Sequence, residues 1–317
     1  MKLHKDKKEF TDAITTLADR LNTAPAIIEK DYYVTMFLQE LNKRVPDLLF
    51  KGGTSLSKCY KIINRFSEDI DLTLDAESQT QSKKRTLNHA VIDVCKEIGF
   101  EILNEEDIFS RRDFNKYEIA YPVTFPSAAL RQHLLVETVF MVKAYPDEYK
   151  PAASMIYDFW KELGDTEAIE QYEMQPFHIR VQTLGRTLID KVFALCNHYL
   201  SNDTTGLSRH IYDLSRLLTV VQLNDELKKL AQEVRYARKE HSNYLIEQQS
   251  GYDIQILLRE IIDKEVYRKD YEAITQRVLF DGTTYDESIK ALEKIIDSGV
   301  FASDDGAGSG KRNDAEM

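Results

Sequence analysis

Apolar residues in the first part of the chain recur with two different periods. Over residues 24–42 they recur every three or four positions, which predicts an amphipathic helix. Over residues 67–75 apolar and polar positions alternate, which predicts a half-buried strand. Between them, the apolar run 48–50 precedes a glycine turn and a helical pattern over residues 56–63. This region therefore predicts an α/β arrangement.

The same patterns continue up to about residue 145, and helical spacing dominates after about residue 180. Further strands are predicted at 100–103, 118–125 and 133–142, with a helix at 86–98. Helices are predicted at 183–200, 207–222, 225–241, 252–265, 268–278 and 284–297. We therefore expect an α/β (α+β), bilobed protein with an N-terminal mixed sheet and an all-helical C-terminal domain.

Composition shifts suggest four segments. Residues 1–145 form the α/β domain, 146–180 a proline-containing connection with a short helix, and 181–300 the helical domain. Residues 301–317 are rich in Gly, Asp and Ser and carry too little apolar surface to offset the entropy of ordering, so we expect a disordered tail.

Composition and charge narrow the class of protein. The 317 residues are 43% apolar, contain no run long enough to span a membrane, and begin with a charged segment unlike a signal peptide, which favours the cytoplasm. Three separated cysteines indicate neither a disulfide framework nor a zinc ribbon. The net charge of −11 repels a polyanion on average, so any nucleic-acid contact must use local basic patches or a metal ion. No motif for reading DNA is present.

Asp69 and Asp71 are the first candidates for chemistry. Residues two apart in a strand point to the same side, so these carboxylates could share divalent cations, although two solvated acids would show the same pattern. Upstream, Gly52, Gly53, Thr54 and Ser55 lie between a predicted strand and helix, where small residues let backbone N–H groups approach a phosphate. The alternative for this loop is a tight turn.

Glu137 is a single carboxylate in an otherwise apolar strand. Burying an ionised group without a partner is costly, so Glu137 either forms a salt bridge, lies on an edge strand, or shares a metal with Asp69 and Asp71. With Asp69 and Asp71 it would form a carboxylate set suited to two-metal phosphoryl or nucleotidyl transfer.

Several charged residues fall on apolar faces of predicted helices. Lys191 either pairs with an acid or faces a cleft and holds a phosphate. Arg209, His210 and Asp213 cluster on the next helix, as a solvated face or a cleft wall. Lys30 and Asp31 also fall on an apolar helix face, so they need a buried partner or a site. Structural pairing is the favoured interpretation.

Taken in order, these motifs resemble the AbiEii/AbiGii-type nucleotidyl transferase toxins, relatives of the MenT toxins in the DNA polymerase β-like nucleotidyltransferase superfamily. The resemblance covers residues 28–214, and the glycine loop with Arg65-Phe66-Ser67-Glu68-Asp69-Ile70-Asp71-Leu72 is its most specific part. The supporting stretches are Ile28–Tyr33, Arg186–Lys191 and Ser208–Leu214.

The resemblance implies a role for each matching residue. The loop from Gly52 to Ser55 would hold nucleotide phosphates, and Asp69 and Asp71 would bind metal, with Glu137 placed only by its position on a following strand. Lys191 would contact the triphosphate, and Asp213 is the acid of the last motif, which also contains Arg209 and His210. The family implies a cognate antitoxin and, in some branches, transfer of nucleotides to tRNA 3′ ends.

Our leading hypothesis is a toxin, of a toxin–antitoxin or phage-defence system, that transfers NMP from an NTP to an acceptor hydroxyl with a two-ion Mg²⁺ site and releases pyrophosphate. Asp69, Asp71 and Glu137 would bind the ions, and Glu137 would alternatively help deprotonate the acceptor. One alternative is a nucleotide-binding regulatory protein that acts by binding a partner; another is a nucleotidyltransferase acting on a small molecule or protein. Basic groups that could bind RNA are Lys83–Arg85, Arg111–Arg112 and the helix with Lys228, Lys229, Arg235, Arg238 and Lys239.

Overall fold

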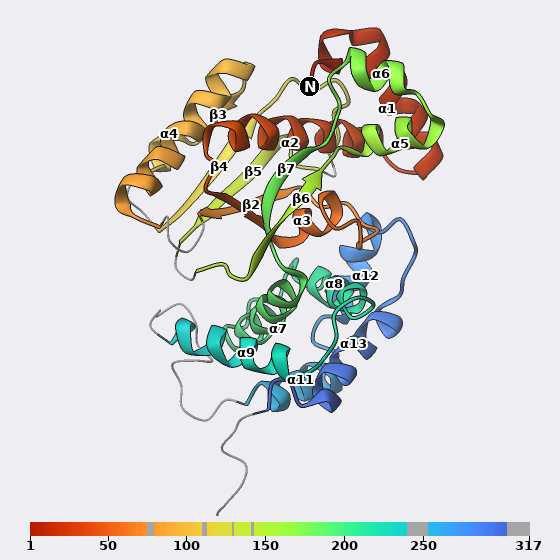
Figure 1. The fold of residues 1–317 in the computed structure, drawn as a ribbon. Helices are drawn as coiled ribbons and strands as arrows, with labels where there is room; N and C mark the ends of the chain where they lie inside the picture. The colour runs from red at the N-terminus through yellow and green to blue at the C-terminus, as the bar shows by residue number, and fades with distance from the viewer. Residues whose placement is uncertain (75–78, 110–112, 129, 141–142, 240–252, 303–317) are drawn as a thin grey trace, which may run out of the picture. The chain divides into compact units, whose positions relative to one another are not determined.

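A computed structural model describes residues 1–74, 79–109, 113–128, 130–140, 143–239 and 253–302 (Figure 1). The expected tail from 303 onward and Arg111–Arg112 lie outside the described residues. The chain divides into two compact units: Met1–Leu188 with Ala273–Thr284, and Ile189–Glu272 with Tyr285–Met317. The helix α7 (Leu184–Leu200) begins in the first unit and ends in the second.

The first unit is built on a seven-stranded mixed sheet in the order β3-β4-β5-β2-β1-β7-β6. Strand β2 pairs antiparallel with β1 and parallel with β5, so it is a central strand. The mixed sheet and the helix-rich α/β class predicted from the sequence are confirmed. The strands are β1 (Leu48–Lys51), β2 (Asp69–Leu74), β3 (Glu101–Ile102), β4 (Phe114–Ala120), β5 (His133–Val139), β6 (Asp147–Ala152) and β7 (Phe177–Gln182).

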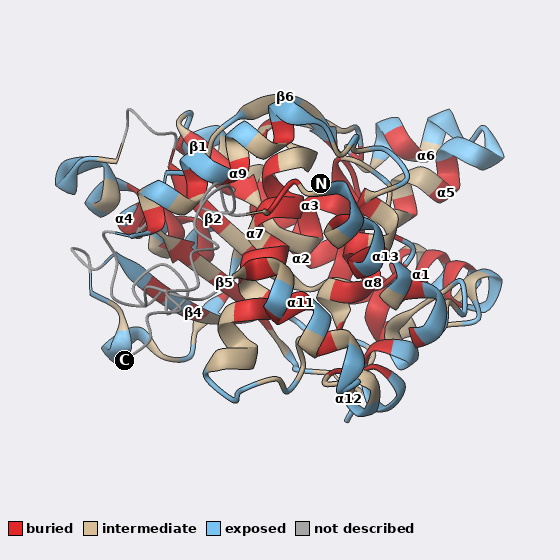
Figure 2. Cartoon of the chain, turned by 90° about the horizontal axis from the view of Figure 1, so that it is seen from below, coloured by how far each residue is buried: buried red, intermediate tan, exposed pale blue. Residues whose placement is uncertain are grey.

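Helix α2 (Pro25–Arg44) is the central helix of the first unit. Fourteen of its 20 residues are buried; Figure 2 colours the chain by burial. Its apolar residues share one core with the inward residues of the central strands, such as Ile70, Leu72 and Val136. Because side chains alternate along a strand, Asp69, Asp71 and Glu137 are directed to the opposite face of the sheet. The core of this unit therefore determines which face carries the acids.

The remaining helices of the first unit complete this core. Helix α1 packs against α2, as does α4, which ends at Gly99 in a left-handed conformation as the sequence predicts. Helix α5 contains Trp160, the single tryptophan, which is buried. Their bounds are α1 (Lys7–Leu21), α3 (Gly52–Lys58), α4 (Gln81–Ile98), α5 (Met155–Leu163) and α6 (Thr166–Gln171), with short 3-10 turns η1 (Leu3–Lys5), η2 (Glu105–Asp107) and η3 (Thr275–Val278).

Two predicted elements differ from the structure by four or five residues at both ends. The helix expected over 56–63 begins at Gly52 and ends at Lys58, because the glycines themselves take up the first turn of α3. The strand expected over 118–125 is β4, which ends at Ala120. Both errors arise because periodicity marks where apolar residues recur and not where backbone pairing begins.

The segment 146–180 contributes two strands to the sheet. The sequence analysis treated it as a connection, whereas β6 and β7 pair there over six residue pairs. Strand β6 reads Asp-Glu-Tyr-Lys-Pro-Ala and lies at the sheet edge, where proline and charged residues are tolerated. Such an edge strand lacks the apolar alternation by which strands are recognised.

The described part of the second unit is helical, apart from its turns. Helices α8 and α11 both pack against α13. Aromatic residues join distant segments of this unit. The Phe193 and Phe301 rings pack edge to face, and the Tyr267 hydroxyl donates a hydrogen bond to the Leu195 carbonyl at 2.8 Å. Beyond α7, its helices are α8 (Arg209–Leu217), α9 (Asp225–Arg238), α11 (Ile254–Asp263), α12 (Arg268–Ala273, whose last residue belongs to the first unit) and α13 (Tyr285–Ser298).

The structure also bears on the cysteines and on membrane-spanning segments. Cys59, Cys95 and Cys196 are buried thiols, and burial raises the pKa of Cys59 and of Cys95 to about 12, so neither of these two forms a thiolate at neutral pH. Over the part of the chain that is described, no helix has the length and apolar character needed to cross a membrane.

Candidate active site

The pairing of β2 with β5 brings three acids together. Asp71 lies directly opposite Glu137. Asp69, two residues before Asp71 on the same face of β2, lies opposite Leu135. Cross-strand neighbours have Cβ atoms roughly 5 Å apart. The three carboxylates singled out in the sequence thus occupy one side of two adjacent strands.

Glu137 lies in an environment that shifts its pKa. Burial raises its pKa, and the charges of Asp71 and Asp69 raise it further, whereas Lys116 and Lys51 act in the opposite direction. The register explains this balance, because Lys51, Asp71, Glu137 and Lys116 form one row across β1, β2, β5 and β4. The sequence analysis missed both lysines, because only the register places them beside the acids.

The chemistry of the three acids fits a hard divalent cation. Carboxylate oxygens are the ligands Mg²⁺ prefers, and the mutual repulsion that raises the pKa of Glu137 would be relieved by a cation. Among the described residues no three His, Cys, Asp or Glu side chains already converge as a complete metal site. Mg²⁺ usually binds through one or two carboxylates, with water and substrate phosphate as its other ligands, so a partial protein set suffices.

Gly52 determines how close the loop comes to these acids. Its φ of +77° lies in the left-handed region, and a Cβ at this position would fall 1.9 Å from Oδ2 of Asp71. A Cβ on Gly53 would fall 2.5 Å from Nη2 of Arg65. The two glycines therefore allow the backbone to lie directly against a carboxylate and a guanidinium.

The hydroxyls of the loop serve the fold. Thr54 and Ser55 are fully buried. The Thr54 hydroxyl donates to the Asp69 carbonyl at 2.5 Å and lies 2.9 Å from Oγ of Ser67, and the Ser55 hydroxyl donates to the Gly52 carbonyl at 2.8 Å. The Thr54 hydroxyl therefore ties the loop to β2, and phosphate binding by the residues from Gly52 to Ser55 stays a prediction.

Arg131 is a site residue that the sequence analysis did not find. Its Nη1 lies 3.5 Å from Oδ1 of Asp69, and about half of its side chain is exposed. It precedes β5 in a segment without periodicity, so no pattern marks it in advance.

The buried charges of α2 are paired, as the sequence predicts. Lys30 forms an ion pair with Glu68. Asp31 accepts from Nζ of Lys58 at 2.6 Å and from the Met155 N–H at 2.7 Å. Burial lowers the pKa of Lys30 and of Lys58, while the paired carboxylates oppose that shift.

The second unit contains the other predicted residues in one cluster. Nζ of Lys191 lies 2.6 Å from Oδ2 of Asp213 and 3.4 Å from Nδ1 of His210, and both Lys191 and Asp213 are buried. Arg209, which begins α8, is partly exposed. Both explanations offered for Lys191 remain compatible with this geometry, because a lysine paired with an acid can also contact a phosphate.

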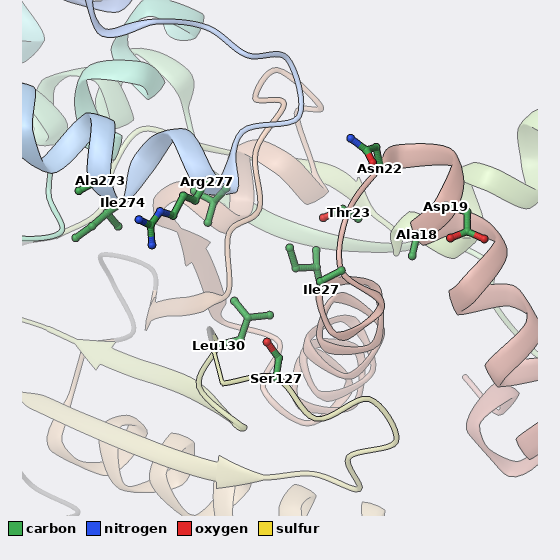
Figure 3. A pocket seen from close by; sticks show the side chains of 12 residues that line it. Ala18, Asp19, Asn22, Thr23, Ile27, Ser127, Leu130, Ala273, Ile274 and Arg277 are labelled. Atoms are coloured by element: carbon green, nitrogen blue, oxygen red, sulfur yellow. The ribbon is translucent and has the colours of Figure 1, made fainter.

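A pocket of about 730 Å³ lies in the first unit, apart from the acids (Figure 3). Asn22 and Thr23 come from the α1–α2 turn and Ile27 from the start of α2, whereas Ile274 and Arg277 come from the α12–η3 segment. Its lining includes none of the three carboxylates. The acids therefore mark a different place from this pocket, and chemistry, more than volume, selects them as the candidate centre.

The predicted basic groups are partly neutralised. Lys83 and Lys84 form ion pairs with Asp47 and Asp113. Arg238 is buried with its guanidinium 4.7 Å from the centroid of the Phe193 ring, so it does not belong to a surface patch.

Paired strand carboxylates beside a glycine turn, on a mixed sheet, form the arrangement that the sequence predicts for nucleotidyl transfer. A family model described as "Nucleotidyl transferase AbiEii toxin, Type IV TA system" matches residues 37–297. The chain belongs to this AbiEii family and is therefore a nucleotidyltransferase of toxin–antitoxin type.

Other comparisons add less. Among solved structures, MenT4, a nucleotidyltransferase toxin from Mycobacterium tuberculosis, is 17% identical with a TM-score of 0.46; the match covers 89% of this chain and 98% of that one. No curated protein matches the chain.

Proposed function

We propose that this protein transfers NMP from an NTP to an acceptor hydroxyl in a Mg²⁺-dependent reaction, and that the acceptor is the 3′ end of an RNA, foremost tRNA. The observation that carries the proposal is the register of β2 and β5, which aligns Asp71 with Glu137 and places Asp69 one step away. Mg²⁺, when bound, would neutralise phosphate charge and stabilise the oxygens that enter and leave.

Each residue has a distinct task in this proposal. Asp69 and Asp71 would hold the cation, with Glu137 beside them, and the backbone at Gly52 and Gly53 would approach the phosphates. Lys191, oriented by Asp213, would contribute positive charge to the triphosphate. His210 and Arg209, on the helix that carries Asp213, would also contribute to nucleotide binding. A cognate antitoxin would restrain the activity in the cell, as in other toxin–antitoxin systems.

The domain boundaries also form part of the proposal. Residues 1–145 would carry the acids, and 181–300 would complete the nucleotide site; 146–180, expected as a connection, would join the two while adding β6 and the start of β7 to the sheet. The two compact units overlap these ranges but divide within α7 and return Ala273–Thr284 to the first unit.

Transfer of a labelled NTP to total RNA tests the proposal. We expect incorporation that requires Mg²⁺ and is lost in Asp71→Ala by about a hundred-fold or more. Unchanged incorporation in Asp71→Ala would remove the carboxylates from the mechanism. Sequencing of RNA 3′ ends after brief induction identifies the acceptor.

Growth arrest provides a second readout. If toxicity persists when Asp69 and Asp71 are both replaced, the protein acts by binding a partner and not by transfer. If transfer occurs but the 3′ ends of cellular RNA are unchanged, the acceptor is a small molecule or a protein.

A further inference from the structure

Three consecutive charged residues lie buried in the middle of α2. Glu29, Lys30 and Asp31 are 0%, 1% and 7% exposed. Charged side chains are almost never buried this deeply unless they are paired. Because successive helical residues point about 100° apart, the three reach different parts of the first unit.

Each of the three contacts a different segment. Glu29 accepts from the backbone N–H groups of Thr124 and Phe125 at 2.7 and 3.0 Å. Asp31 pairs with Lys58 at the end of α3. Lys30 contacts the residues that lead into the two strands carrying the acids.

Lys30 connects the starts of β2 and β5. Its ammonium pairs with Glu68, the residue immediately before β2, and donates to the carbonyl of Arg131, two residues before β5, at 2.8 Å. The two strands run parallel, so these contacts lie at the same end of the pair. One buried ammonium thus connects the entry points of both strands.

The same contacts surround Asp69. Glu68 is its neighbour in the chain, and the Arg131 side chain lies 3.5 Å from its carboxylate. The Arg131 backbone is held by Lys30, and its guanidinium faces Asp69. Displacement of Lys30 would therefore affect Asp69 by two routes, through β2 and through Arg131.

We infer that Lys30 is a positioning residue for nucleotidyl transfer, which holds the starts of β2 and β5 together so that Asp69 and its neighbouring acids keep the spacing a cation needs. The inference rests on the proposed function, because it assigns those acids to the metal. A purely structural Lys30 would affect stability alone.

The double variant Lys30→Met/Glu68→Met separates position from charge. It removes both members of the ion pair, so the local net charge is unchanged and no buried charge is left unpaired. Mn²⁺ binding is measured by electron paramagnetic resonance with a non-hydrolysable NTP analogue, and transfer kinetics with Mg²⁺. We expect Mn²⁺ binding weakened about five-fold or more and kcat lowered about ten-fold or more, with KM for the NTP nearly unchanged.

Glu29→Gln is the matched control. Glu29 is the adjacent buried charge on the same helix, and it contacts the loop with Thr124 and Phe125, which carries none of the three acids. We therefore expect Mn²⁺ binding and kcat close to those of the wild type. A folded double variant with both quantities within about two-fold of wild type would overturn the inference. If the double variant does not fold, Lys30→Arg, which keeps the charge but moves the donors, is measured instead, and wild-type values there would overturn it equally.

Failure of the inference and failure of the proposed function give different results. If wild-type protein transfers no nucleotide, the proposed function fails, and Mn²⁺ binding that is equal in wild type and double variant removes the inference as well. If Asp71→Ala abolishes transfer while the double variant behaves as wild type, only the role of Lys30 is refuted.

Discussion

Replacing Gly52 with alanine tests whether the close approach of the loop to Asp71 matters for function. A non-glycine residue in the left-handed region costs roughly 1–2 kcal/mol. In addition, the new Cβ would lie 1.9 Å from Oδ2 of Asp71, whereas real Cβ contacts stay beyond 3.0 Å, so the carboxylate or the loop must shift by about 1 Å. A 1 Å displacement of a reacting group costs on the order of a hundred-fold in rate, or about 2.7 kcal/mol.

Gly99→Ala provides the matched control. Its φ of +75° imposes a similar backbone cost, but a Cβ there has no heavy atom within 4 Å. Urea unfolding followed by Trp160 fluorescence reports on the first unit, and initial rates of labelled-NTP transfer report on the site. We expect both variants to lose roughly 1–2 kcal/mol of stability, and only Gly52→Ala to lose about a hundred-fold in transfer. Transfer by Gly52→Ala within about three-fold of that by Gly99→Ala would refute the reasoning.

Two further predictions concern buried charges. Lys58→Met should lower the free energy of unfolding by about 3–5 kcal/mol, because it leaves Asp31 buried without its cation. Lys43→Met, which removes an exposed i,i+3 ion pair, is the control. Equal changes in the free energy of urea unfolding for the two variants would contradict this prediction. Glu137→Gln should raise stability in metal-free buffer at pH 7. The pKa of Glu137 is raised on folding, so its ionisation destabilises the folded state above the unfolded value of about 4.3 and has no effect well below it. The gain should therefore disappear as the pH falls towards about 4, and a gain that instead grows at low pH would show that the shift has the opposite sign.

Much of the fold follows from apolar spacing. Most helices of the second unit lie close to their predicted ranges, because amphipathic faces repeat over many residues, whereas the helices expected over 207–222 and 268–278 end early, at Leu217 and Ala273. Strands are shorter and their signals weaker. Thus β6, polar and at the sheet edge, was not predicted as a strand, and β4 was placed too late in the chain.

The candidate site divides in the same way. Asp69, Asp71, Glu137 and the glycine loop were recognisable because their residue types and spacing are chemically unusual. Arg131 and the flanking lysines of the sheet were not recognisable, because common residues at unremarkable positions acquire meaning only from what lies beside them.

The sequence by itself determined the class of protein, the side of β2 on which its acids lie and the need for partners at Lys30 and Asp31, since each follows from local periodicity or from the cost of burying charge. Only the tertiary structure decided which strand lies beside β2, and therefore that Glu137 is opposite Asp71 and that Lys30 contacts Glu68 and Arg131. The physical reason is that strand pairing, ion pairs and hydrogen bonds join residues far apart in the chain, such as Lys30 and Arg131, which are 101 positions apart, and their choice depends on the packing of the whole unit.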